Sequence, residues 1–440
     1  MPLFLALLLS TQAVDVPDLR TRKTGVDWPN FLGPTQDSIS SETGLLARWP
    51  EEGPKVVWQR AVGEGYGPPA VQKGRLFHVE RAGAKIRTTA VKSETGEELW
   101  RFDYETDYTD TYGYDGGPRC GPVADDDRVY IHGPEGKFHC LRAVDGAVLW
   151  KKDFAAEFNV VQNFFGAGSA PLIEGELLLV QVGGSPPGSP GIQSGEVRGA
   201  GSGLVAFDKR SGALKYRISD ELAGYSSPRT ATIDGRRWGF LFARGGLLGF
   251  EPTSGKIDFH HPWRARILES VNASQPVVVG DHVLISECYG VGGTLLKVKP
   301  GGCEVVWADG RKRDPSLATH WMTSIPLDGH VYGSSGRHKE NAELRCVELK
   351  TGAVKWSVSG LTRMSLLLAD GRFIALGEDG TLRLFKADPL KYEEISKAQL
   401  RTPDGSPLLR YPAWAAPVLT HGLLYVRGKD RLACLDLLVK

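Results

Sequence analysis

The sequence has no excess of charge of either sign and no long hydrophobic run beyond its first residues. Its 440 residues include 53 lysines and arginines against 52 aspartates and glutamates, for a formal net charge of +1. A protein that binds nucleic acid or an anionic membrane surface is expected to carry a clustered basic excess. A membrane-spanning helix needs about 20 consecutive apolar residues. We therefore expect neither a nucleic-acid partner nor a transmembrane segment.

The sequence also lacks the short motifs of common enzymes and metal sites. It contains no Gly-x-Ser-x-Gly elbow, no His-Glu-x-x-His and no Walker loop. None of the six cysteines forms a Cys-x-x-Cys motif, and no two are adjacent. The acidic run from Asp125 to Asp127 could suggest calcium, but it falls where a hairpin turn is expected. We predict no catalytic residue and no metal site.

A repeated hairpin is the strongest pattern that is present. Residues 140–150 read Cys-Leu-Arg-Ala-Val-Asp-Gly-Ala-Val-Leu-Trp, in which Asp145-Gly146 is a tight-turn pair between two apolar runs. Two further strand signals precede it, separated by the acidic turn. Residues 122–150 therefore predict one four-stranded antiparallel unit, which cannot bury both of its faces alone.

The unit recurs at a spacing of roughly 40 to 50 residues, which is typical of blade repeats. Clear copies of the hairpin lie at residues 90–100, 206–216 and 346–356, weaker ones at 249–259 and 297–307, and a degenerate one near 385–392. The last copy, residues 417–438, runs out of chain before its outer strand, and residues 55–58 (Lys-Val-Val-Trp) can supply it. We predict an all-β, eight-bladed β-propeller of four-stranded antiparallel blades, closed by an N-terminal strand.

The cysteines fit this repeat better than they fit a disulfide framework. Cys140, Cys346 and Cys434 occupy the position that alanine fills in other copies, ten residues before the tryptophan position. A free cysteine behaves as a small hydrophobic residue, and we expect a small residue where a neighbouring blade's aromatic ring packs. For Cys120, Cys288 and Cys303 the sequence predicts no pairing.

The repeat resembles a known family. The pattern Ala-x-Asp-x-x-Thr-Gly-x-x-x-Trp is similar to that of the pyrroloquinoline-quinone-type (PQQ-like) β-propellers over nearly the whole chain after the N-terminal arm. Residues 27–34 (Asp-Trp-Pro-Asn-Phe-Leu-Gly-Pro) and 53–55 resemble a secreted bacterial branch of that family. Fold and chemistry separate readily on such scaffolds, so the resemblance implies the fold more strongly than a function.

The N-terminus has two expected parts. Residues 3–9 form an apolar run, and residues 10–13 offer a small-residue cleavage site, so residues 1–13 are interpreted as a signal peptide that lacks a positively charged start. Residues 14–54 form an arm with little periodicity, in which Trp28, Phe31 and Trp49 are expected to hold the arm against a propeller face. Residues 55–440 are the predicted propeller. This organisation predicts a periplasmic or secreted protein, and we expect a monomer.

Two segments depart from the repeat. Residues 183–203 are rich in Gly, Ser and Pro, and we expect a mobile loop that is too polar to pack. Residues 386–410 are expected to be helical or irregular, and to replace or decorate the outer strands of the seventh blade.

Aligning the blades predicts a ring of side chains at one mouth of the central channel. Residues three or four before the inner-strand proline share this position, because the first strand of every blade lines the channel. The register gives Tyr66, Arg119, Tyr225, Asn272, His320, Arg363 and Trp414. Arginines and aromatic faces in a concave mouth suit a planar, anionic or sugar-like ligand. The alternative is that these groups bond only to water and to neighbouring strand ends.

Three classes of function follow. The first is a non-enzymatic scaffold or binding module of the bacterial envelope with protein partners, as the resemblance to outer-membrane-assembly propeller lipoproteins implies. The second is a PQQ-dependent quinoprotein dehydrogenase. The family resemblance implies for such enzymes a calcium ion, a catalytic aspartate and a vicinal disulfide, but this ring contains no aspartate and the chain has no adjacent cysteines. The third is binding of a carbohydrate or small metabolite at the channel mouth. The first class is our prediction, with no cofactor.

Overall fold

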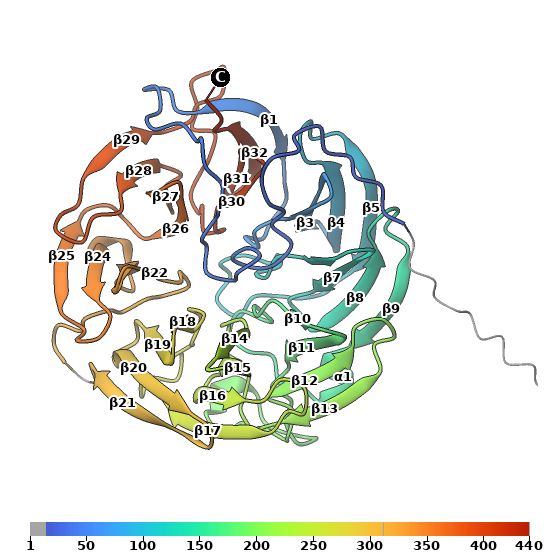
Figure 1. Cartoon of the computed structure of the whole chain (residues 1–440). Helices are drawn as coiled ribbons and strands as arrows, with labels where there is room; N and C mark the ends of the chain where they lie inside the picture. The colour runs from blue at the N-terminus through green and yellow to red at the C-terminus, as the bar shows by residue number, and fades with distance from the viewer. Residues whose placement is uncertain (1–14, 311, 440) are drawn as a thin grey trace, which may run out of the picture.

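The computed structural model of the chain describes residues 15–310 and 312–439, and it has eight four-stranded antiparallel sheets arranged around a central channel (Figure 1). The predicted signal peptide, residues 1–13, lies outside the described residues. The predicted propeller is confirmed. Seven of these sheets each consist of four strands that are consecutive in the chain, and the eighth combines the last three strands with the first one. Among the described residues, no helix is long and apolar enough to span a membrane.

The strands form four concentric layers. The innermost strands are β2 (Ala70–Gln72), β6 (Val123–Asp125), β10 (Leu172–Glu174), β14 (Arg229–Ile233), β18 (Val277–Val279), β22 (Ile325–Leu327), β26 (Met364–Ala369) and β30 (Val418–Thr420). The second layer is β3 (Arg75–Ala82), β7 (Arg128–His132), β11 (Leu177–Gln181), β15 (Arg236–Phe242), β19 (His282–Glu287), β23 (His330–Ser335), β27 (Arg372–Gly377) and β31 (Leu423–Arg427). The third is β4 (Lys85–Lys92), β8 (Lys137–Arg142), β12 (Leu204–Asp208), β16 (Gly246–Phe250), β20 (Gly292–Lys299), β24 (Glu343–Glu348), β28 (Leu382–Lys386) and β32 (Arg431–Asp436). The outer wall is β5 (Glu98–Glu105), β9 (Val148–Asp153), β13 (Leu214–Ile218), β17 (Ile257–Pro262), β21 (Gly302–Ala308), β25 (Val354–Ser359), β29 (Glu394–Ala398) and β1 (Lys55–Ala61).

The ring is closed by strand β1, as predicted. It pairs antiparallel with β32, and Trp58 lies opposite Cys434 in the same register in which Trp150 lies opposite Cys140. The two ends of the chain therefore rebuild one ordinary repeat. Closure by a paired strand removes the open sheet edges that an unclosed array would expose.

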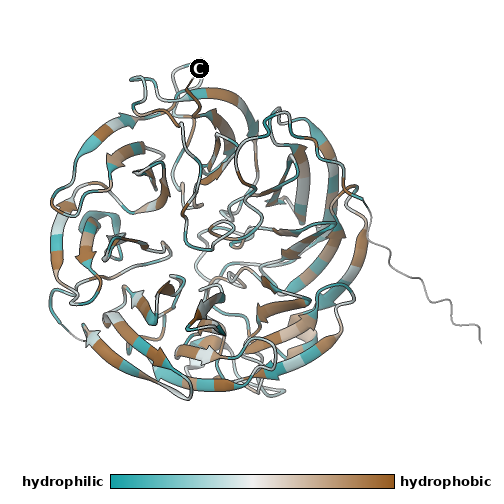
Figure 2. Ribbon diagram, viewed as in Figure 1, coloured by the Kyte–Doolittle hydropathy of each residue, from teal (hydrophilic) through white to brown (hydrophobic). Residues whose placement is uncertain are grey.

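Burial follows the layers. Second-layer strands such as β27 are almost wholly buried, whereas outer strands such as β25 alternate between exposed and partly buried residues. Figure 2 shows the same difference, with mainly hydrophobic inner strands and an outer wall of alternating character. The core of the molecule is therefore the set of apolar layers between adjacent blades.

The repeated tryptophan joins each blade to the next. The Trp100 indole Nε1 donates to the Ala143 carbonyl at 2.9 Å, and the Trp150 Nε1 donates to the Lys209 carbonyl at 3.2 Å. The turn glycine of the next blade lies directly against the ring. At Gly146, which has φ +75°, an added Cβ would come within 2.5 Å of the Trp100 ring. Only glycine meets both the backbone and the space requirement there, which explains why the turn glycine recurs against the tryptophan of the preceding blade.

This arrangement refines the expectation for the cysteines. The residue that lies against the neighbouring blade's ring is the turn glycine, whereas Cys140 pairs across the strands with Trp150 of its own blade. All six cysteines are free thiols, and Cys140, Cys346 and Cys434 are buried.

The two irregular segments differ from expectation. Residues 386–410 are not helical, since they contain strand β29, the regular outer strand of the seventh blade. Residues 183–203 do pack: Ile192 is 8% exposed and joins a cluster with Phe164 and Val271, and Val197 packs against the same cluster. Ser185 and Ser202 at the two ends of the segment are buried as well.

The arm lies along the innermost strands, which have no sheet partner on the channel side. Trp28 exchanges two backbone hydrogen bonds of 2.9 Å with Val71 of β2, and the Pro29 carbonyl accepts from the Ala124 amide of β6. Across the channel, the Ser38 carbonyl accepts from the Leu368 amide of β26. Trp28 is 1% exposed. The arm thus satisfies exposed strand edges on opposite sides of the channel, and Figure 1 shows it crossing the centre of the ring.

Candidate functional site

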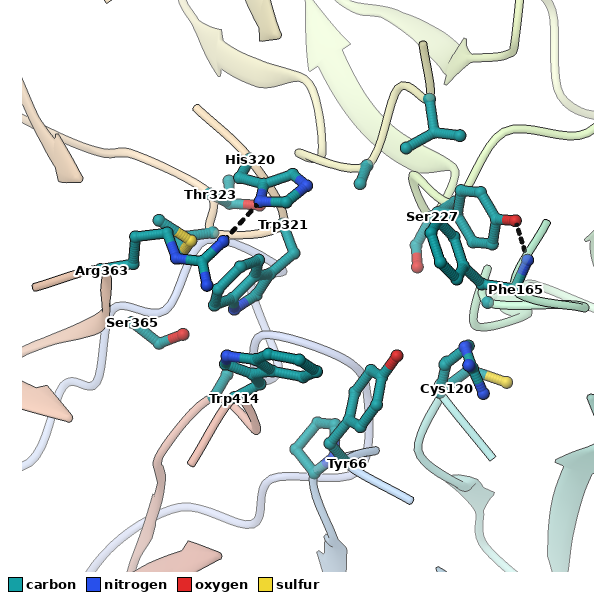
Figure 3. Close-up of a pocket in the computed structure, with 18 of the residues that line it drawn as sticks. Tyr66, Cys120, Phe165, Ser227, His320, Trp321, Thr323, Arg363, Ser365 and Trp414 are labelled. Atoms are coloured by element: carbon teal, nitrogen blue, oxygen red, sulfur yellow. Dashed lines mark hydrogen bonds between the residues drawn. The ribbon is translucent and has the colours of Figure 1, made fainter. Parts of the chain in front are cut away.

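A cavity of about 540 Å³ occupies the central channel, a size typical of small-molecule sites. Phe31, Leu32 and Ser38 of the arm line it, together with the connections that lead into the innermost strands. Figure 3 shows Trp321 and Trp414 on one side of this space and Phe165, Ser227 and Cys120 on the other, with Tyr66 between the two groups.

Six of the seven residues predicted for the channel mouth line this cavity. They are Tyr66, Arg119, Tyr225, His320, Arg363 and Trp414. Asn272 is fully buried instead, and its Nδ2 donates to the carbonyls of Ala243, Arg244 and Trp263 at 2.7 to 3.2 Å. An amide that bonds three carbonyls of neighbouring loops holds those loops together and does not face a ligand.

Arg119 is held on all sides by protein groups. Its Nη2 donates to the Asp110 carboxylate at 2.9 Å and its Nη1 to the Gly117 carbonyl at 2.8 Å. The guanidinium carbon lies 5.3 Å from the centre of the Tyr66 ring and 5.9 Å from that of Phe165. The side chain of Arg119 is 5% exposed and that of Asp110 is 2% exposed. The charge of this arginine is therefore neutralised inside the wall.

Arg363 is paired in the same way on the opposite side. Its Nε and Nη2 donate to the two oxygens of Glu378 at 3.0 and 2.6 Å, which is a bidentate ion pair. The second oxygen of Glu378 also accepts from the Trp414 Nε1 at 3.0 Å. One buried carboxylate thus fixes both the arginine and the indole of the predicted ring.

His320 is neutral in this setting. Burial and the nearby Arg363 and Arg337 cations lower its pKa to about 3. The Arg363 Nη1 lies 3.1 Å from His320 Nδ1, and the Tyr289 hydroxyl lies 2.9 Å from Nε2 (Figure 3 shows the first contact). Because an arginine can only donate, Nδ1 is the acceptor and the ring proton resides on Nε2.

Several lining residues lie outside the predicted register. Trp321 is the sequence neighbour of His320 and packs against Trp414 in a tilted arrangement, with 5.3 Å between ring centres. Tyr289 and Arg337 come from the connections between the second and third strands of two adjacent blades, β19 to β20 and β23 to β24. An alignment restricted to the approach to the innermost strand cannot find them. The signals in those connections were the tyrosine of residues 288–291 and the basic run of residues 337–339 (Arg-His-Lys).

The rim of the mouth carries exposed aromatic side chains. Tyr112, Tyr114 and Tyr411 are 43%, 67% and 54% exposed. The Asp110 carboxylate accepts hydrogen bonds from the backbone amides of Tyr112 and Tyr114 at 3.1 and 3.0 Å, so the same acid that pairs Arg119 also shapes this loop. The rim is therefore a preformed aromatic surface around the cavity.

The donor groups of the mouth do not fit a calcium ion with a quinone. Asp110 and Glu378, the carboxylates that its arginines hold, already carry several donors. Glu340, which is among the lining residues, lies 3.6 Å from Lys339. No group of three or more His, Cys, Asp or Glu in the described part of the chain is arranged to hold a metal ion. Two arginine-bound carboxylates offer few free oxygens for the six to eight ligands that calcium takes.

The comparisons with known proteins agree with the fold. No curated protein matches the sequence. The structure is similar to BamB from Moraxella catarrhalis, with 14% identity and a TM-score of 0.55 over 86% of this chain and 98% of that one. It is also similar to the quinohemoprotein alcohol dehydrogenase from Comamonas testosteroni, with 13% identity and a TM-score of 0.51 over 93% of this chain and 80% of that one. A computationally designed protein, Ika8, has a TM-score of 0.54 at 11% identity over 88% of this chain and all of the designed chain.

Such low identities show a shared architecture alone, since BamB and an alcohol dehydrogenase both have it. The sequence itself is more specific. Residues 84–358, well over half of the chain, match the sequence model of one family. The repeat, the ring of blades and this match together show that the chain belongs to the PQQ-like propeller family described as outer membrane protein assembly factor BamB.

Proposed function

We propose that this protein is a non-enzymatic binding module of the bacterial cell envelope, exported to the periplasm or beyond, whose partners are proteins. The single observation that carries the proposal is the exposed aromatic rim of Tyr112, Tyr114 and Tyr411 around the channel mouth. Exposed tyrosines in a fixed loop provide large contact area at low entropic cost, and aromatic residues dominate the energetics of protein interfaces.

The paired charges of the mouth support the same reading. Arg119 and Arg363 each bind a buried carboxylate, and His320 is neutral, so these groups stabilise the surface and are not poised to exchange protons with a substrate. The family description, an assembly factor for outer membrane proteins, supports an unfolded or partly folded outer-membrane protein as the partner.

The test is binding of an outer-membrane β-barrel precursor, diluted from urea, to the purified chain, followed by fluorescence anisotropy of the labelled precursor. The variant Tyr112→Ser/Tyr114→Ser should weaken binding about tenfold, which corresponds to about 1.4 kcal/mol. The matched control is Val305→Ser/Val306→Ser on the outer strand β21, where the two side chains are 53% and 42% exposed. Equal binding by the rim variant and the wild type, or an equal loss in the control, would contradict the proposal.

A further inference from the structure

One cation of the cavity has no carboxylate partner. Arg119 pairs with Asp110, Arg363 pairs with Glu378, and Lys339 lies 3.6 Å from Glu340 at the edge. Arg337 forms no ion pair with any residue in 15–310 or 312–439, and its guanidinium carbon lies 4.6 Å from the centre of the Tyr289 ring. The cavity therefore offers one positive charge that the protein does not neutralise.

The buried acid at the start of the Tyr289 connection does not serve this arginine. Glu287 is 1% exposed, and its two oxygens accept hydrogen bonds from the backbone amides of Tyr289 and Val291 at 2.6 and 2.5 Å. It is therefore engaged by the turn that follows it. Arg337 is half-buried and lines the cavity, so its N–H groups have only solvent or a ligand as partners.

A free hydroxyl hydrogen lies beside this cation. The His320 proton is on Nε2, so Nε2 donates to the Tyr289 hydroxyl oxygen at 2.9 Å. The tyrosine's own hydrogen is then left to donate elsewhere, and no other partner for it is found among the described residues. Tyr289 lines the cavity. Arg337 and Tyr289 together form a donor pair that suits one oxyanion.

An apolar surface continues from this donor pair. Tyr289 lies 5.6 Å from His320, Trp321 lies 5.3 Å from Trp414, and Trp414 lies 5.0 Å from Tyr66, as ring-centre distances. The arm adds Phe31 and Leu32. Flat apolar rings pack well against such a belt by stacked or edge-on contacts.

We propose that the central cavity binds a small organic monoanion with a flat aromatic body, with its carboxylate held by Arg337 and Tyr289 and its ring against Trp321 and Trp414. One unpaired cation sets the charge of the ligand at one, because a second buried carboxylate would meet only arginines that already have partners. The rim tyrosines border this cavity, but the residues proposed to hold the carboxylate, Arg337 and Tyr289, are not among them, so variants can test the two proposals independently.

The test uses 2-naphthoate and its uncharged analogue 2-naphthamide, with calorimetry and quenching of tryptophan fluorescence as the two measurements. Wild-type protein should bind naphthoate at least tenfold more tightly than naphthamide, with quenching by both. Arg337→Gln should weaken naphthoate binding about tenfold and leave naphthamide binding unchanged. Tyr289→Phe should weaken naphthoate binding by a smaller factor.

The matched control is Arg217→Gln on the outer strand β13, where the arginine is exposed. It should change neither affinity. Absence of naphthoate binding, equal binding of the two compounds to the wild type, or an equal loss in Arg337→Gln and Arg217→Gln would overturn the proposal. Circular dichroism and the melting curve of Arg337→Gln exclude misfolding as the cause of a loss, since this side chain has no ion pair to break.

Discussion

The contacts between neighbouring blades repeat around the ring, whereas the side chains that line the channel mouth differ between blades. Between blades, one tryptophan and one turn glycine recur, as at Trp100 with Gly146 and at Trp150 with Gly212. At the mouth the side chain at the shared position varies from blade to blade, from Tyr66 to His320 to Trp414. The arginines there are held by an acid of the same connection, Asp110, or of the same blade, Glu378. The repeated contacts hold the ring together, and the side chains that differ between blades form the site.

The largest expected effect breaks the repeated contact. Trp150→Ala removes a ring that stacks on Phe138 with 5.6 Å between centres, and a hydrogen bond to the next blade. We expect the free energy of unfolding to fall by about 3 to 5 kcal/mol, as for other large aromatic truncations. Urea denaturation measures the change. Leu214→Ala on the next blade, where Leu214 is 53% exposed, should have little effect, and comparable losses in the two variants would refute the assigned contact.

A somewhat smaller effect is expected at the mouth. Glu378→Gln leaves Arg363 buried without a counter-charge, and breaking a buried pair in this way costs about 3 kcal/mol. The control Asp126→Asn makes the same change in the exposed pair of Lys73 with Asp126, where the expected cost is below about 1 kcal/mol. Thermal and urea unfolding of both variants measure the difference. If Glu378→Gln were as stable as Asp126→Asn, Arg363 would not depend on Glu378 and would be available to a ligand, as the sequence alone suggests.

The smallest effect is a dependence on pH. Burial raises the pKa of Glu378, but hydrogen bonds from Arg363 and Trp414 outweigh it and leave the pKa below its usual value of 4.5. A carboxylate with a lowered folded-state pKa stabilises the protein above pH 4.5, and this contribution is lost as the pH falls through the folded-state pKa. The difference in unfolding free energy between wild type and Glu378→Gln should therefore shrink below pH 4.5. A difference that stayed constant from pH 7 to pH 3 would contradict the pairing.

Much of the fold could be predicted because the repeat is local. The hairpin of residues 140–150 contains its own turn glycine and its own tryptophan, and these reappear at a regular spacing. The pairing of β1 with β32 followed from a missing strand at one end and an unassigned strand at the other. Strand β29 was not predicted, because its charged surface residues interrupt the alternation of apolar and polar residues that a half-buried strand usually shows.

The site could be predicted only in part. The blade register placed Tyr66, His320 and Trp414 at the cavity, since it depends on the same periodicity as the fold. It also included Asn272, whose amide bonds the backbone, because a register gives a position and not the direction of a side chain. Tyr289 and Arg337 enter from connections in which the blades differ.

The sequence by itself determined the number of blades, the closure of the ring and the contacts between neighbours, because each depends on residues that are close in the chain or that repeat. Only the tertiary structure decided which cations of the mouth are free. Arg363 and Glu378 are fifteen residues apart, and Arg337 lacks an acid although Glu340 follows three residues later. Charge pairing depends on distance and burial across blades, and neither quantity is encoded in a local pattern.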